Sequence, residues 1–168
     1  MIDFKRYIDV VPDFPSAGIL FRDISPLLRQ HLAEATDAIG NLFSVSEWNA
    51  INVVAGIEAR GFILAAALAI RLHKGFVAVR KQGKLPPPVV ATKYTLEYGS
   101  GVLEMKRGEG GVLIVDDVLA TGGTLSAAVE LCLAAGYRVE GLAALIDLKL
   151  NTDGRIRGIK VRSVIQYD

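Results

Sequence analysis

The stretch that decides the fold reads Val112-Leu113-Ile114-Val115-Asp116-Asp117-Val118-Leu119-Ala120-Thr121-Gly122-Gly123-Thr124. It begins with an apolar, β-branched run that is typical of a buried strand, and it ends in small residues that favour a turn into a helix. Adjacent glycines and short hydroxyl side chains let backbone N–H groups crowd around a tetrahedral anion, and a helix amino terminus adds a favourable dipole. The end of the stretch therefore predicts a phosphate-binding loop, formed by Ala120, Thr121, Gly122, Gly123 and Thr124.

Two adjacent carboxylates, Asp116 and Asp117, follow the apolar run. Ionised carboxylates would repel a phosphate, so they are better suited to ribose hydroxyls, to a divalent cation, or to positive charge that develops during a reaction. The loop lacks the Gly-Lys-Ser/Thr ending of an ATP-type phosphate loop and the Gly-x-Gly-x-x-Gly spacing of a dinucleotide site. This combination indicates a phosphorylated sugar as the ligand.

Outside this stretch, apolar runs alternate with Ala- and Leu-rich segments, which is the pattern of repeated strand–helix–strand units. The first unit is predicted at residues 51–56, 62–72 and 76–79, the second at residues 112–115, 124–135 and 139–146, and a last strand at residues 159–165. We expect an α/β fold, a single domain over residues 1–168 with a parallel sheet and helices on both faces. Arg60 follows the first strand, at the edge where open α/β sheets bind ligands.

The segment between the two units has a different sequence pattern. Residues 81–88 read as an exposed loop, and residues 94–98 and 102–105 as two short antiparallel strands around Gly99-Ser100-Gly101. We expect residues 82–98 to form a mobile hairpin lid that swings about Gln82 and Gly83, because the three prolines at 86–88 would stiffen the arm.

The composition limits the remaining classes of function. The 168 residues are 51% hydrophobic and carry a formal net charge of +1, which argues against general attraction to nucleic acid or to an anionic membrane. The longest apolar run, residues 62–70, is too short to span a bilayer. The single cysteine, Cys132, fits a reducing compartment, and His31 and His73 lie too far from other ligands to indicate zinc. The expected protein is soluble and cytoplasmic.

Three further stretches match long motifs in a fixed order along the chain. They are residues 14–28, which include Leu20-Phe21-Arg22; Gly56-Ile57-Glu58-Ala59-Arg60-Gly61-Phe62; and Arg80-Lys81-Gln82-Gly83-Lys84-Leu85-Pro86, followed by Tyr94-Thr95-Leu96-Glu97-Tyr98-Gly99. Together with residues 116–124 they resemble the type I phosphoribosyltransferases, and in particular their adenine-specific branch. The resemblance implies a cytoplasmic purine salvage enzyme that joins adenine to the ribose of 5-phosphoribosyl-1-pyrophosphate (PRPP), giving AMP and pyrophosphate.

The resemblance also implies roles for particular residues. The phosphate-binding loop would hold the 5-phosphate, and Asp116 and Asp117 would face the ribose. The pyrophosphate would bind a loop with a cis peptide bond before Ala59 and nearby cations, a set formed by Glu58, Ala59, Arg60, Gly61, Arg80, Lys81 and Lys84. The base would lie between an adenine-binding turn and an apolar residue, a set formed by Leu20, Phe21, Arg22 and Leu148. Glu97 would assist proton movement, so that the catalytic set would be Glu97, Asp116, Asp117 and Arg60.

Mg²⁺ is expected as a cofactor that is held mainly by substrate oxygens and water, without dedicated protein ligands. The family also tends to form homodimers. This chain departs from the family pattern at Ala17 and at Pro87, and Pro87 makes lid closure less secure than substrate binding. Two alternatives stay open here: a phosphoribosyltransferase for hypoxanthine, guanine, xanthine or orotate, and a regulator that senses PRPP without catalysis.

Overall fold

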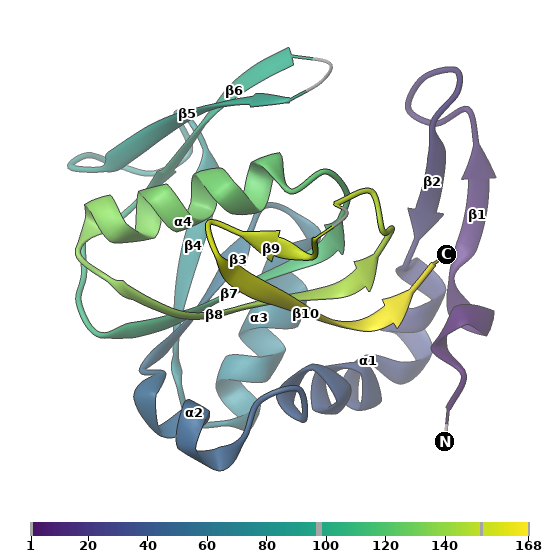
Figure 1. Cartoon of the computed structure of the whole chain (residues 1–168), viewed down its shortest axis with the longest axis horizontal. Coiled ribbons are helices and arrows are strands. Elements are labelled where there is room, and N and C mark those ends of the chain that lie inside the picture. Colours follow the sequence, from purple (N-terminus) through teal and green to yellow (C-terminus); the bar gives the residue numbers. More distant parts are fainter. Residues whose placement is uncertain (1, 97–98, 152, 168) are drawn as a thin grey trace.

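The computed structural model describes residues 2–96, 99–151 and 153–167 (Figure 1). The helical elements are η1 (Phe4–Tyr7), α1 (Ser25–Gly40), α2 (Val45–Ala50), α3 (Arg60–Arg71) and α4 (Gly123–Ala135). The strands are β1 (Asp9–Pro12), β2 (Leu20–Asp23), β3 (Val53–Ile57), β4 (Gly75–Lys81), β5 (Val90–Leu96), β6 (Gly99–Met105), β7 (Gly111–Leu119), β8 (Arg138–Asp147), β9 (Arg155–Ile156) and β10 (Ile159–Gln166).

The main sheet has the strand order β5-β6-β4-β3-β7-β8-β10-β9. Neighbouring strands are parallel along the series β4-β3-β7-β8-β10. The pairs β6–β4, β5–β6 and β9–β10 are antiparallel. The two predicted units become β3–α3–β4 and β7–α4–β8, which leave the centre of the sheet in opposite directions. The predicted parallel α/β sheet is confirmed, with antiparallel strands added at both edges.

Side chains of β7 alternate between two buried clusters, as the two-residue period of a strand requires. Val112 and Ile114 face the layer of α4, while Leu113 and Val115 face the layer of α1, α2 and α3. Both faces of the central strands are therefore covered, which explains why their sequence is apolar without interruption. Figure 1 shows α4 on one side of the sheet and α1 to α3 on the other.

Strands β1 and β2 form a separate two-stranded antiparallel sheet. It stands beside the main sheet, next to the carboxyl end of β10 (Figure 1). The resemblance assigned Leu20, Phe21 and Arg22 to a turn, but these residues lie in β2, where the pairing with β1 holds them extended. The segment predicted to bind adenine is thus one strand of a small hairpin.

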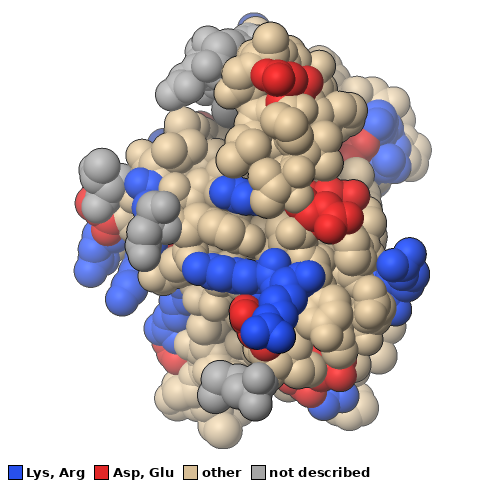
Figure 2. Space-filling model, turned by 90° about the vertical axis from the view of Figure 1, so that its right-hand side faces the viewer, with Lys and Arg blue, Asp and Glu red and all other residues tan. Residues whose placement is uncertain are grey.

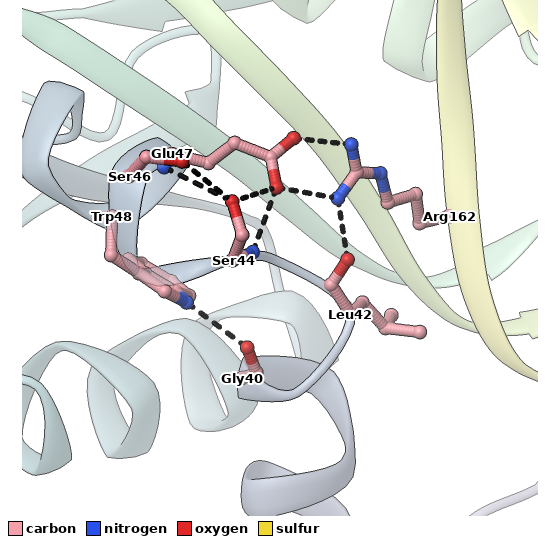
Figure 3. A network of polar contacts seen from close by, with 7 residues as sticks. All are labelled: Gly40, Leu42, Ser44, Ser46, Glu47, Trp48 and Arg162. Atoms are coloured by element: carbon pink, nitrogen blue, oxygen red, sulfur yellow. Dashed lines mark hydrogen bonds and ion pairs between the residues drawn. The ribbon is translucent and has the colours of Figure 1, made fainter.

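A polar network anchors α2 to the far edge of the sheet (Figure 3). Ser44 caps α2 in a capping box with Glu47, and Glu47 also pairs with Arg162 of β10. Hydrogen bonds from Arg162 and Ser44 lower the pKa of Glu47 to about 2. This network lies away from the ligand edge and serves to hold the fold.

The predicted hairpin between the two units is present, but its strands have other bounds. Gly99, Ser100 and Gly101 were expected in the turn, yet they begin β6 and pair with β5, where Gly99 lies opposite Leu96. Val90 and Tyr94 of β5 pack against the core beside α4. Among the described residues, no helix combines the length and apolar character that crossing a membrane requires.

Candidate active site

Two helices begin at the ligand edge of the sheet without a capping side chain. Strands β3 and β7 are parallel neighbours, and the helices that follow them, α3 and α4, lie on opposite faces of the sheet. Both helices therefore start close to the point where the strand order of the sheet reverses direction. The N-cap residues are Ala59 for α3 and Gly122 for α4, and neither side chain makes a capping hydrogen bond. Backbone N–H groups in a first helical turn lack intrahelical partners and attract anions. The fold therefore creates two candidate anion sites on either side of Asp116 and Asp117.

The predicted phosphate-binding loop, residues 120–124, lines a cavity of about 560 Å³. Gly122 has a φ of 92°, a left-handed conformation that other residues adopt at a cost. A Cβ atom on Gly122 would also lie 2.3 Å from Cδ1 of Ile156. The glycine is required by both the turn and the packing. Asp116, Leu20, Arg22 and Leu148 line the same cavity, so that it joins the predicted phosphate, ribose and base residues.

Asp116 and Asp117 are both 8% exposed, which is unusual for adjacent acids. Burial and the neighbouring charge of Asp117 raise the pKa of Asp116 well above its ordinary value. Nη2 of Arg60 lies 2.5 Å from Oδ2 of Asp117. The two groups do not meet the geometry of a hydrogen bond. Among residues 2–96, 99–151 and 153–167, Oδ2 of Asp117 is the one buried side-chain nitrogen or oxygen without a hydrogen bond. One guanidinium thus compensates the charge of two buried carboxylates.

Arg60 connects the acids to the hairpin. Its Nη1 donates to the carbonyl oxygen of Arg22 at 3.2 Å, and its guanidinium lies 4.7 Å from the ring centre of Phe21. Gly61, the next residue, is so close to β7 that a Cβ atom would lie 3.2 Å from Oδ1 of Asp116. The start of α3 therefore packs directly against the acid pair, which explains the need for glycine at 61.

The predicted pyrophosphate residues form a second group, which we call the cation cluster: Glu58, Arg80, Lys81 and Lys84. The Glu58 carboxylate accepts hydrogen bonds from Nζ of Lys84 at 2.5 Å and from the backbone N–H of Lys81 at 2.9 Å, and Nε of Arg80 lies 3.4 Å away. Burial alone would raise the pKa of Glu58, but these hydrogen bonds and positive charges lower it overall. The peptide bond between Glu58 and Ala59 is cis, as the resemblance implied.

Figure 2 shows the side of the molecule that carries the β1–β2 hairpin, where Lys and Arg side chains gather near the middle with acidic groups beside them. The guanidinium of Arg22 lies 4.2 Å from the ring centre of Tyr167, which also lines the cavity. Basic side chains are thus concentrated on this side of a chain whose net charge is only +1.

The structure gathers the predicted residues in two places. The 5-phosphate, ribose and base residues share the cavity, except for Phe21 and Asp117, while Arg60 and the cation cluster lie outside its lining. Glu97 lies outside the described residues. Sequence reasoning missed Tyr167, Gly18 and Ile19, which also line the cavity. The signal for Tyr167 was its place at the carboxyl end of β10, since parallel strands bring these ends to the same edge.

Comparison with known proteins identifies the family of the chain. Residues 27–164 match the phosphoribosyl transferase domain family. A protein of Hydrogenovibrio crunogenus called adenine phosphoribosyltransferase is 52% identical over 97% of this chain and 95% of its own. The crystal structure of the adenine phosphoribosyltransferase from Rhodothermus marinus is 44% identical, with a TM-score of 0.87 over 98% of this chain and 96% of that chain.

A third relative was solved with ligands. The adenine phosphoribosyltransferase of Saccharomyces cerevisiae, in complex with adenine and an imino-altritol bisphosphate, is 32% identical, with a TM-score of 0.88 over 96% of both chains. These full-length similarities establish that the chain belongs to the adenine phosphoribosyltransferase family.

Proposed function

We propose that this site transfers the 5-phosphoribosyl group of PRPP to adenine and releases pyrophosphate, through the residues described above. The observation that carries this assignment is the pair of uncapped helix starts, at Ala59 and Gly122, on either side of two buried carboxylates. PRPP has an anionic group at each end of a ribose, so its charge pattern matches this order of sites. The relative from Saccharomyces cerevisiae was solved with adenine and an imino-altritol bisphosphate, which supports a base and a bisphosphate as the ligands of this site.

In this proposal the phosphate-binding loop holds the 5-phosphate, and the cation cluster with residues 58–61 holds the pyrophosphate. The bond between the anomeric carbon and the pyrophosphate oxygen breaks, and the electron pair leaves with the pyrophosphate. Negative charge then grows where Arg60, Arg80 and Lys84 can stabilise it, while positive charge grows on the ribose near Asp116 and Asp117.

The base completes the reaction when N9 of adenine bonds to the anomeric carbon and loses its proton. We assign the base to the space between β2 and Leu148, where Phe21 would stack on the purine and the backbone of Leu20 and Arg22 would read its edge. This assignment is supported by the cavity, which Leu20, Arg22 and Leu148 line together. Glu97 is proposed to assist the proton transfer.

Mg²⁺ fits this site as an ion carried by the substrate. Pyrophosphate and ribose hydroxyls offer the oxygen ligands that Mg²⁺ prefers. Asp116 and Asp117 would be the nearest carboxylates to an ion bound mainly by pyrophosphate, ribose hydroxyls and water, where it would neutralise part of the leaving group's charge, and Asp117 is already paired with Arg60.

The decisive experiment incubates the protein with Mg²⁺ and PRPP and with adenine, hypoxanthine, guanine, xanthine or orotate in turn, and measures the nucleotide formed. AMP should form much faster than the other nucleotides, because a 6-oxo base leaves buried groups of an adenine site unpaired, at about 1–3 kcal/mol per group. The double variant Asp116→Asn, Asp117→Asn serves as a control and should lose turnover while it stays folded. Comparable rates with hypoxanthine would contradict the adenine site, and PRPP binding without any product would favour the regulator.

We further propose that the chain forms a homodimer through the outer face of α3. Ile63 and Ile70, two turns apart on α3, are exposed, and so is Phe76 of β4. A surface that exposes several large apolar side chains is typical of a protein interface. Light scattering coupled to size-exclusion chromatography should give the mass of a dimer, and Ile63→Glu with Ile70→Glu should give a monomer. A cytoplasmic location fits the buried thiol of Cys132 and is tested by fractionation of the source cells.

A lid over residues 82–98 also stays part of this proposal, with a different hinge. The N–H of Gln82 donates to the carbonyl oxygen of Val102 at 3.0 Å, so this end of the segment is tied to β6. We therefore assign the movable part to residues after Pro88. Bound Mg²⁺ and PRPP should slow trypsin cleavage after Lys93, and unchanged cleavage at saturating ligand would argue against closure.

A further inference from the structure

We propose that Glu104 is a positioning residue for the pyrophosphate subsite, because its buried carboxylate fixes the loop that carries Lys84. The inference rests on the proposed role of the cation cluster in binding pyrophosphate. Glu104 lies near the end of β6, opposite Arg80 of β4, and is only 3% exposed. A buried carboxylate in a strand is costly unless it has strong partners, so its contacts show what it does.

The partners of Glu104 are backbone groups of the neighbouring loop. Its Oε1 accepts hydrogen bonds from the N–H groups of Lys84 at 2.8 Å and of Leu85 at 2.7 Å. The N–H of Gly83 contributes most to lowering the pKa of Glu104, and this effect with the other two N–H groups and the charge of Arg80 outweighs burial. Three consecutive N–H groups thus converge on one carboxylate, as around an anion in a backbone nest.

Lys106 fastens the other end of the same loop. It lies two residues after Glu104, directly beyond the end of β6, and its Nζ donates to the carbonyl oxygens of Pro86 and of Pro88, the latter at 3.0 Å. Residues 83–88 are therefore held at both ends, by an acid of β6 that binds N–H groups and by a base just after β6 that binds carbonyl groups. An unattached surface loop would not show this pairing of charge with backbone polarity.

This attachment determines where the Lys84 side chain can reach. The carbonyl oxygen of Lys84 accepts a hydrogen bond from Nη1 of Arg80 at 3.2 Å. The side-chain Nζ of Lys84 lies 2.5 Å from the carboxylate of Glu58. Glu58 immediately precedes the uncapped start of α3 at Ala59. The backbone contacts of Glu104 thus place a cation at the anion site, although Glu104 itself contacts no other member of the subsite through a hydrogen bond.

The test is Glu104→Gln, which keeps the size of the side chain but removes its charge. The KM for PRPP should rise about five- to tenfold, the effect of weakening hydrogen bonds by roughly 1 kcal/mol or slightly more. The KM for adenine should change less than about twofold, because the base site lies on the other side of Arg60. Amide hydrogen exchange at Gly83, Lys84 and Leu85 should become faster. Glu109→Gln, which removes an exposed acid, should leave all of these quantities unchanged.

Lys84→Ala separates this inference from the role that it rests on. If Lys84→Ala raises the KM for PRPP and adding Glu104→Gln raises it little further, both stand. If Lys84→Ala has no effect on that KM, the pyrophosphate role of Lys84 is wrong and the inference falls with it. If only Lys84→Ala has an effect, or if Glu104→Gln raises both KM values equally, Glu104 does not position the subsite. Should Glu104→Gln fail to fold, Glu104→Asp, which keeps the charge but shortens the reach, takes its place with the same readings.

Discussion

Replacing Asp116 by asparagine should make the protein more stable while it loses activity. Asp116 is 8% exposed, lies beside a second buried carboxylate, and shares with it the single guanidinium of Arg60. Its Oδ1 accepts the N–H of Asp117 at 2.9 Å, a hydrogen bond that an asparagine oxygen can retain. The substitution thus removes a buried charge and a like-charge repulsion without removing this contact.

The size of the gain follows from the cost of burying that charge. An ionised group that is desolvated without full compensation costs on the order of 1–3 kcal/mol, and Arg60 compensates only in part. Because the pKa of Asp116 is raised in the folded state above its ordinary value of 3.8, the folded protein binds more protons in the window between these two values. Its unfolding free energy therefore falls as the pH rises through that window. Asp116→Asn has no carboxyl group at this position and so does not lose stability over that pH window. We therefore expect its unfolding free energy to exceed that of the wild type by about 1–3 kcal/mol at neutral pH and by little below pH 3.8.

Urea unfolding at neutral pH and near pH 3.8, followed by circular dichroism, measures both differences. The AMP assay with Mg²⁺, PRPP and adenine should show turnover reduced by at least a hundredfold, if the carboxylate stabilises charge on the ribose. Glu109→Gln serves as the control, because that acid is exposed. A variant less stable than wild type at neutral pH, or a gain of equal size at both pH values, would refute the reasoning about burial.

Three further substitutions test other parts of the fold. Arg162→Met should destabilise the protein at neutral pH, and the difference should shrink as the pH falls from 4.5 towards 2, because Glu47 contributes its ion pair only while ionised; urea titrations at several pH values measure this. Gly122→Ala should cost about 1–2 kcal/mol of stability through its left-handed φ and raise the KM for PRPP, whereas the neighbouring substitution Ser126→Ala should leave both values near those of wild type. Arg60→Met should lower the unfolding free energy by about 1–3 kcal/mol, since it leaves the acid pair buried without a cation, and an unchanged urea midpoint would contradict the ion pair.

The sequence predicted the central sheet because its strands are buried on both faces. An uninterrupted apolar run such as residues 112–115 has few alternatives to a central parallel strand, and glycine at 136 marks the end of the helix that follows. The hairpin was harder to predict, since Gly99 and Gly101 suggested a turn. In the structure Gly101 lies in β6 against the ring of Tyr94, where a Cβ atom would lie 2.7 Å from the ring. Cross-strand packing, which the local sequence does not reveal, determines that glycine.

The candidate site was predicted as a set of motifs, and the structure adds the contacts between them. The phosphate loop could be predicted from local chemistry, because glycines and short hydroxyl residues at the start of a helix let backbone N–H groups gather around an anion. No local pattern indicates that Arg60 pairs with Asp117, or that its guanidinium lies over Phe21, since these residues come from three distant parts of the chain. Likewise, Glu104 and Tyr167 acquire their places only when distant strands pair.

The contacts of Arg60 bear on how the site changes when substrates bind. In this structure its guanidinium faces Asp117 and the ring of Phe21, which the proposal assigns to the ribose and the base, respectively. A pyrophosphate at the start of α3 would offer Arg60 a second, more highly charged partner, while positive charge on the ribose would offer one to Asp117. Both exchanges replace an internal ion pair by contacts with the substrate, so the free energy of breaking the pair is offset only when both ends of PRPP are bound. Ribose 5-phosphate lacks the pyrophosphate, so it should bind more weakly than the contacts it has in common with PRPP would suggest. Arg60→Met should reduce the difference between the affinities for PRPP and for ribose 5-phosphate. Equal ratios of the two dissociation constants in wild type and Arg60→Met, measured by isothermal titration calorimetry, would show that Arg60 does not exchange partners in this way.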